Sequence, residues 1–129
     1  PAPIMFVVGY VGPVTPKGRN MLYAPGTDLV SATALTAAGA HMVLFSTGRG
    51  TPFGAPAPTL KIATNSQLAA RKKTWIDFNA GVVADGERTL DEAGADLYRL
   101  VLDVASGKQT CAEKKGFREI SIFKDGVVL

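Results

Sequence analysis

Apolar residues fall into short runs along the chain, and turn-forming residues separate one run from the next. None of these runs has the length of a typical helix, so each is predicted to be a strand. The runs occupy positions 4–8, 21–24, 42–45, 60–63 and 75–78. The run at 42–45 is continuously apolar, which is expected of a strand buried on both faces. A last segment, 119–123, alternates between polar and apolar residues and is also predicted to be a strand.

Helices are predicted between these strands. An alanine-rich segment at 29–38 follows Thr27 and Asp28, either of which suits a helix N-cap, and a shorter helix is predicted at 66–72 with Ser66 as its cap. The clearest helix is predicted at 89–106, where the first and fourth residues, Thr and Glu, form a capping box. Its apolar positions recur at helical spacing and are predicted to face the core: Leu90, Ala93, Leu97, Leu100, Val101 and Val104.

The alternation of strands and helices favours an α/β fold. We predict a three-layer sandwich with a mostly parallel sheet, of the Rossmann or flavodoxin type. Residues 1–20 contain four prolines and three glycines and lack a sustained period, so they are predicted to be a linker or entry segment with one short strand. Residues 21–129 are predicted to form the α/β domain. The order of the strands cannot be derived from the sequence.

Composition narrows the class of protein. A chain of 129 residues with 47% hydrophobic and 19% charged residues is typical of one folded globular domain. The net charge of +3 is spread along the chain without a basic stripe, so nucleic-acid binding is not expected. No apolar run approaches the roughly 20 residues of a membrane span. Cys111 is the only cysteine and no signal peptide is evident, which favours a reducing, cytoplasmic setting.

The most informative segment is the glycine-rich loop at 46–54, which follows the best predicted buried strand. Ligands of open α/β sheets bind at the carboxyl ends of strands. Gly48 and Gly50 let backbone N–H groups approach a ligand, Thr47 offers a hydroxyl, and Arg49 could clamp a carboxylate or phosphate with two hydrogen bonds. A packing loop with a structural ion pair is an equally good interpretation. The loop matches neither the Walker A nor the GxGxxG pattern, which disfavours a nucleotide.

Other residues give weaker signals. Asp77 and Asn79 lie at the end of the strand predicted at 75–78, where they could bind a sugar hydroxyl or a metal, but support of a loop is the more common role. Lysines such as Lys61 could attract an acid, although lysines of such charge runs are usually solvated. His41 has no histidine or cysteine nearby, so no metal site is predicted. Cys111 is predicted to be an unreactive free thiol.

Three stretches resemble one known family. They are GAHMVLFSTGRGTPFG at 39–54, PTLKIATNSQLAARKKTWIDFNAG at 58–81 and ASGKQTCAEKKGFREISIFKDGVVL at 105–129. Together they are similar to the altronate/galactarate dehydratase family, and the last stretch is closer to its altronate branch. The resemblance extends from about residue 25 to the end of the chain, whereas the first 20 residues match poorly.

The resemblance implies that this chain is the C-terminal domain of a longer enzyme with a β-rich N-terminal domain and a central domain. The complete enzyme would be a hydro-lyase of hexuronate catabolism that converts D-altronate to 2-dehydro-3-deoxy-D-gluconate and water. It would depend on iron(II), whose ligands we expect in the other domains. The chain alone is expected to be inactive and to hold no cofactor. Galactarate or another sugar acid stays open as the substrate, and so does a homo-oligomeric state.

The role predicted for this domain is substrate binding, with a small-molecule sugar acid and the rest of the same polypeptide as partners and with no membrane partner. The catalytic base remains unidentified. We expect Arg49 to bind the substrate carboxylate, with hydrogen bonds from Thr47, Gly48 and Gly50 and a secondary role for Asp77 and Asn79. Two alternatives remain: a module that binds a small anion on its own, and a structural module that only mediates assembly.

Overall fold

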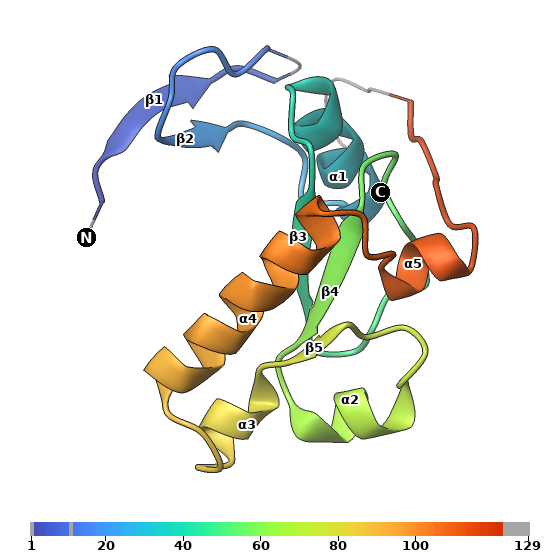
Figure 1. Ribbon diagram of the computed structural model, residues 1–129. Coiled ribbons are helices and arrows are strands. Elements are labelled where there is room, and N and C mark those ends of the chain that lie inside the picture. The colour runs from blue at the N-terminus through green and yellow to red at the C-terminus, as the bar shows by residue number, and fades with distance from the viewer. Residues whose placement is uncertain (1, 11, 123–129) are drawn as a thin grey trace.

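A computed structural model describes residues 2–10 and 12–122 of the chain. Strands and helices alternate through most of it (Figure 1). The elements are β1 (Ile4–Val8), β2 (Arg19–Leu22), α1 (Asp28–Ala37), β3 (Val43–Thr47), β4 (Thr59–Ala63), α2 (Ser66–Arg71), β5 (Phe78–Asn79), α3 (Gly81–Ala84), α4 (Leu90–Ala105) and α5 (Cys111–Lys114). The predicted α/β class is therefore confirmed.

The central sheet has the strand order β3-β4-β5, and both of its strand pairs are parallel. Helix α1 packs against β3, whereas α2 and α5 pack against β4, so helices cover the central strand (Figure 1). This layering agrees with the predicted α/β sandwich and its parallel strands. The described strands form two small sheets instead of one, and the Rossmann or flavodoxin type stays a prediction.

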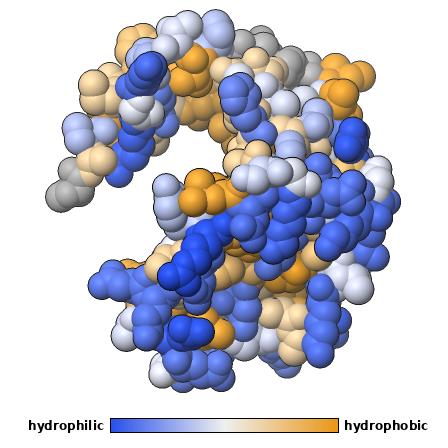
Figure 2. All heavy atoms as spheres, in the orientation of Figure 1, coloured by the Kyte–Doolittle hydropathy of each residue, from blue (hydrophilic) through white to orange (hydrophobic). Residues whose placement is uncertain are grey.

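The second sheet is a parallel pair of β1 and β2 that extends away from the central sheet (Figure 1). The strand predicted at 4–8 is confirmed, whereas the one predicted at 21–24 starts and ends two residues earlier. Four consecutive apolar side chains of β1 are exposed: Ile4, Met5, Phe6 and Val7. Parallel sheets are normally covered on both faces, so this pair leaves unusual apolar surface open. Figure 2 shows a deep hollow between this projecting arm and the rest of the molecule.

Two buried clusters hold the central sheet. The first joins Ala32 of α1 and Val43 of β3 to Phe53 and Ala55 at the end of the glycine-rich loop. The rings of Phe53 and Phe45 meet edge to face with their centroids 5.0 Å apart, a favoured aromatic geometry. The second cluster joins the end of β4 to α2 and to the segment before β5 through Ala63, Leu68 and Ile76. The core therefore anchors both ends of the loop at 46–54.

Helix α4 begins as predicted, because the Thr89 hydroxyl accepts from the Glu92 N–H while the Glu92 carboxylate accepts from the Thr89 N–H. The prediction that its apolar face lies in the core is wrong for Leu90, which is 74% exposed. Only Ala93 and Val104 of that face are fully buried. The first turns of α4 pack against the short α3, which is too small to cover them. None of the helices described, α4 included, has the length and apolar character needed to cross a membrane.

The strand predicted at 119–123 is not present in its described part, residues 119–122. The N–H of Glu119 donates to the Gly54 carbonyl at 2.8 Å, and the N–H of Ser121 donates to the Thr33 hydroxyl at 3.1 Å. The segment therefore satisfies its backbone on a loop and a helix, and it has no neighbouring strand. Phe123 and the turn predicted at 124–126 lie outside the described residues.

The remaining differences between the predicted and the observed elements concern one helix cap and three short elements. The cap of α2 is Asn65 and not Ser66, because the Asn65 side chain accepts from the Leu68 N–H at 2.8 Å. The strand predicted at 75–78 is reduced to the two residues of β5. The helices α3 and α5 were not predicted, although Thr110 and Glu113 form a second capping box at the start of α5. Four residues are too few to show a helical period.

The cap of α4 gives a first testable prediction. Thr89→Ala should lower the free energy of unfolding by about 1 kcal/mol, because the N-terminal amide of the helix loses its acceptor. Hydrogen bonds from the Thr89 backbone and side chain lower the pKa of Glu92. A carboxyl whose pKa is lowered by folding stabilises the protein above its unfolded pKa and loses this effect as the pH falls through its folded pKa.

The loss caused by Thr89→Ala should therefore shrink in acid, which urea denaturation at pH 7 and pH 3 would measure. Thr74→Ala, at an exposed threonine without such a cap, is the control. An equal loss at both pH values would contradict the role assigned to the Glu92 carboxylate.

Candidate anion-binding pocket

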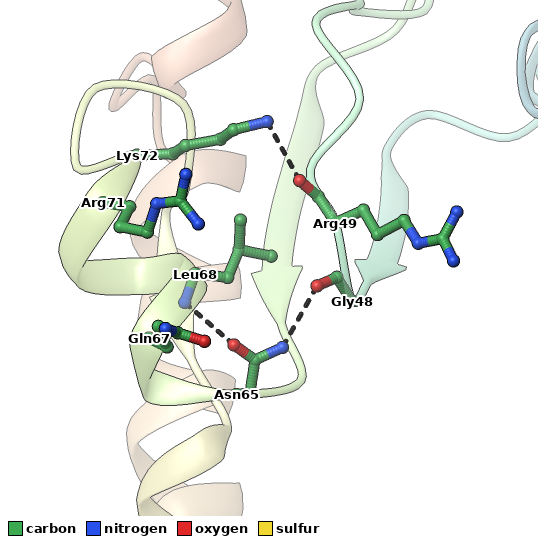
Figure 3. Close-up of a pocket in the computed structure, with 7 residues that line it drawn as sticks. All are labelled: Gly48, Arg49, Asn65, Gln67, Leu68, Arg71 and Lys72. Carbon is green, nitrogen blue, oxygen red and sulfur yellow. Dashed lines mark hydrogen bonds between the residues drawn. The ribbon is translucent and has the colours of Figure 1, made fainter.

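A pocket of about 280 Å³ lies where the adjacent parallel strands β3 and β4 end. Gly48 follows β3 and Asn65 follows β4, so two loops meet at one edge of the sheet. Seven residues line this space, which we call the cationic pocket: Gly48, Arg49, Asn65, Gln67, Leu68, Arg71 and Lys72 (Figure 3). The carboxyl edge is where ligands of open α/β sheets bind, and the sequence predicted this edge through the loop at 46–54.

Gly50 lets the loop approach α2 closely. Its φ of +80° lies in the left-handed region, and a Cβ there would lie 3.0 Å from the Lys72 Cδ and 3.1 Å from a methyl carbon of Leu68. The Gly50 N–H donates to the Thr47 hydroxyl at 2.9 Å. Thr47, Gly48, Arg49 and Gly50 therefore form one tight turn, with the Thr47 hydroxyl already engaged inside it.

Two side chains from the α2 side hold this turn through its carbonyls. The Asn65 amide donates to the Gly48 carbonyl at 3.1 Å, and the Lys72 ammonium donates to the carbonyls of Arg49 at 2.9 Å and Gly50 at 3.1 Å. Figure 3 shows the Asn65 and Lys72 side chains reaching across the pocket to the loop. Both side chains are committed to the protein, so they shape the pocket more than they offer donors to a ligand.

A third brace comes from inside the protein. Lys61 of β4 is only 1% exposed, and its ammonium donates to the Thr51 carbonyl. Burial lowers the pKa of Lys61, while the carboxylates of Asp77 and Glu119 act in the opposite direction. The expectation that lysines of this region are solvated is therefore wrong for Lys61, because its strand position faces the interior.

The donors left for a ligand belong to three other side chains. Among residues 2–10 and 12–122, the side chains of Arg49, Gln67 and Arg71 have no hydrogen-bond or ion-pair partner within the protein. Arg71 lies on the same side as Lys72, whereas the Arg49 guanidinium extends away from α2 (Figure 3). None of the lining residues is acidic. The pocket thus presents guanidinium donors, which suit a carboxylate or phosphate.

Asp77 and Asn79 lie outside the lining of this pocket. The two oxygens of the Asp77 carboxylate accept from the N–H groups of Lys61 at 2.8 Å and Cys111 at 2.7 Å. The Asn79 oxygen accepts from the N–H of Gly81 at 3.0 Å. Both side chains thus connect neighbouring segments behind the pocket, an arrangement that fits the loop-support role more closely than sugar binding.

Sequence reasoning missed the half of the pocket that α2 supplies. Lys72 was considered only as a lysine that could attract an acid, Arg71 only as part of the same short basic run, and Asn65 and Gln67 were not considered. A signal was present, since Asn65 comes two residues after the strand predicted at 60–63, much as Gly48 comes three residues after the strand predicted at 42–45. Without the strand order, nothing in the sequence says that these two strand ends are neighbours.

A metal centre and a reactive thiol are two other kinds of site that the sequence analysis considered. In the described part of the chain, no group of three or more His, Cys, Asp or Glu side chains could hold a metal ion. These residues do not fit the iron(II) implied by the resemblance, so no step is assigned to a metal here. Burial, followed by the charge of Asp77, raises the pKa of the Cys111 thiol, which keeps it protonated at neutral pH.

The parallel sheet and the cationic pocket at its carboxyl edge define an α/β domain with a candidate site for a small anionic ligand. Residues 1–128 match the family model described as D-galactarate/Altronate dehydratase, C-terminal, and the chain belongs to this family. The resemblance found in the sequence is thereby confirmed. The match also includes the first 20 residues, so the family similarity begins earlier than the sequence motifs indicated.

Curated relatives agree with this assignment. The chain is 50% identical over 126 residues to altronate dehydratase of Escherichia coli (strain K12), a match that covers 98% of the chain and 25% of the relative. It is 44% identical over 128 residues to altronate dehydratase of Bacillus subtilis (strain 168), covering 99% of the chain and 26% of the relative. It is 41% identical over 118 residues to galactarate dehydratase (L-threo-forming) of Escherichia coli (strain K12), a match that covers 88% of the chain and 23% of the relative. The chain thus spans about a quarter of the length of these relatives.

Proposed function

We propose that this chain is the C-terminal domain of a sugar-acid dehydratase and that its cationic pocket binds the carboxylate of the substrate. The observations that carry the proposal are the unpartnered Arg71 guanidinium on the α2 side of the pocket and the unpartnered Arg49 on the tight glycine turn opposite, at the carboxyl edge of the sheet. The names of the relatives support the substrate class, because altronate and galactarate are both sugar acids. D-altronate is the proposed substrate, since the two relatives with the highest identities reported above are altronate dehydratases.

The chemistry explains why a cationic pocket is useful. Dehydration of a sugar acid removes the proton next to the carboxylate and expels the hydroxyl on the following carbon. The carboxylate is negatively charged in the substrate and stays so as that proton leaves, so fixed positive donors bind both the substrate and the transition state. In this proposal Arg71 and Arg49 bind the carboxylate, Gln67 and the Gly48–Gly50 turn bind neighbouring oxygens, and Asp77 and Asn79 support the site.

The proposal leaves the proton transfers to the rest of the enzyme. The catalytic base, the acid for the departing hydroxyl and the iron(II) expected from the resemblance are proposed to belong to the domains outside this chain. The place in hexuronate catabolism and the cytoplasmic setting are parts of the same proposal. The place in hexuronate catabolism follows from the proposed substrate. The cytoplasmic setting follows from the single cysteine.

Single arginine substitutions test the proposal. In the complete dehydratase that carries this domain, Arg71→Ala and Arg49→Ala should each raise the KM for D-altronate about tenfold, because each removes a charged hydrogen bond worth about 1.4 kcal/mol. Steady-state kinetics measure this change. Arg99→Ala is the matched control, since Arg99 is an exposed arginine of α4 that pairs with Asp96. If both pocket variants kept the native KM and kcat, the pocket would not be the carboxylate site.

A structural role in assembly is the second candidate, and the exposed apolar side chains of β1 favour it. A chain that served only assembly would tolerate both arginine substitutions without kinetic change. The same kinetic experiment therefore separates the two functions.

A further inference from the structure

Lys61 is the most unusual buried group among the described residues. It lies in the middle of β4, opposite Phe45 of β3, and its side chain is 1% exposed. Its ammonium lies 5.3 Å from the centre of the Phe53 ring and donates to the Thr51 carbonyl. No carboxylate among the described residues forms a salt bridge with it. A buried charge with so little compensation destabilises a fold, and a hydrophobic side chain of similar size would avoid that cost.

The contact of Lys61 completes a series along the glycine-rich loop. The carbonyls of four consecutive residues, 48 to 51, all accept hydrogen bonds from side chains, namely those of Lys61 in β4, Asn65 before α2 and Lys72 just after α2. Asn65 and Lys72 hold the first three carbonyls from the solvent side, whereas Lys61 holds the fourth from the interior. Side chains thus brace the turn that carries Arg49 from two sides.

We propose that Lys61 is a positioning residue for sugar-acid binding, which acts by fixing the Thr51 carbonyl and with it the turn that carries Arg49. This inference rests on the proposed function of the cationic pocket. Lys61 itself does not line the pocket and does not touch the substrate. Without its ammonium, the Thr51 carbonyl keeps the Phe53 N–H as a donor but loses its bond to β4, so the end of the turn is held less firmly and the substrate has to order it when it binds.

Lys61→Met in the complete dehydratase is the direct test, because it removes the charge and keeps the length of the side chain. The KM for D-altronate should rise about tenfold, equivalent to about 1.4 kcal/mol, while kcat stays within about twofold. The thermal midpoint should stay equal or rise, since a buried charge is gone. Lys61→Arg should recover part of the KM, because it restores a cationic donor. Lys73→Met, at an exposed lysine near the end of α2, is the control and should change nothing.

A purely structural role would give a different pattern. The thermal midpoint would fall in Lys61→Met, both kinetic constants would worsen together, and Lys61→Arg would recover nothing. That pattern would overturn the inference, as would a native KM in Lys61→Met. If Lys61→Met does not fold, Phe53→Leu decides the question. This variant removes the ring beside the ammonium, and it should raise the KM about threefold at constant kcat; an unchanged KM would overturn the inference.

The arginine variants separate this inference from the proposed function. A raised KM in Arg71→Ala with a native KM in Lys61→Met removes the positioning role and leaves the pocket as the carboxylate site. Native kinetics in both variants remove the inference together with the proposed function. Raised KM values in both variants, with the stability pattern given above, support the two proposals.

Discussion

Gly81→Ala is expected to lower the free energy of unfolding by about 3 kcal/mol, one of the two largest effects predicted for this chain. A Cβ at Gly81 would lie 2.2 Å from the backbone nitrogen of Ser66 and 2.5 Å from the carbonyl carbon of Asn65. Backbone atoms cannot rotate out of the way, so the start of α2 and the start of α3 would have to separate. Asn65 would then move away from the Gly48 carbonyl, and the cationic pocket would lose one of its braces.

Urea denaturation of the chain, followed by far-ultraviolet circular dichroism, measures this loss. Gly94→Ala is a matched control, because Gly94 lies within α4 and a Cβ there meets no atom within 4 Å. Alanine is the better helix former, so the control should gain up to about 1 kcal/mol of stability. We therefore expect the free energy of unfolding to fall in Gly81→Ala and to rise in Gly94→Ala. A loss below about 1 kcal/mol in Gly81→Ala would mean that α2 and α3 are packed less closely than described.

Asp77→Ala is expected to cost about 3 kcal/mol, because two N–H groups lose a charged acceptor at once. One carboxylate oxygen accepts from the Lys61 N–H in β4 and the other from the Cys111 N–H at the start of α5. Asp77→Asn should cost nearly as much, since an amide has one acceptor and would direct an NH₂ group at one of these donors. The same denaturation experiment measures both variants.

Asp85→Ala is the control for Asp77, because Asp85 is an exposed aspartate that follows α3. It should change the stability by no more than about 0.5 kcal/mol. The Asp77 result also discriminates between the two roles considered from the sequence. Support of the fold predicts a large loss of stability, whereas a bond to a sugar hydroxyl predicts native stability and a raised KM for D-altronate.

Features encoded over a few neighbouring residues were predicted well. The capping box at Thr89 and Glu92 and the apolar period behind it specify α4, because caps and helical spacing act between residues three or four positions apart. The apolar run before Ser46 specifies β3 for a similar reason, but the prediction that this strand is buried on both faces is wrong, because Leu44 is 51% exposed. The glycine-rich loop was placed at the carboxyl edge of the sheet, since every parallel strand ends at that edge.

Burial was predicted less well, because it depends on what lies opposite a residue. The apolar pattern of α4 predicted a core face, yet Leu90 is exposed where only the short α3 is available to cover it. Lys61 shows the reverse case, since its residue type predicted solvent and its position in β4 placed it inside. The alternating pattern at 119–123 predicted a strand, but no described strand lies beside residues 119–122 to pair with it.

The amino-acid sequence by itself determined the α/β class, the main helices and strands, the family motifs and one half of the pocket around Arg49. Only the tertiary structure brought Arg71 and Lys72 of α2 to that loop, buried the ammonium of Lys61 beneath Thr51, and gave Asp77 a supporting place. The physical reason is distance along the chain. A cap or a turn is decided by adjacent residues, whereas a pocket needs the pairing of β3 with β4, and this pairing depends on contacts that no local pattern records.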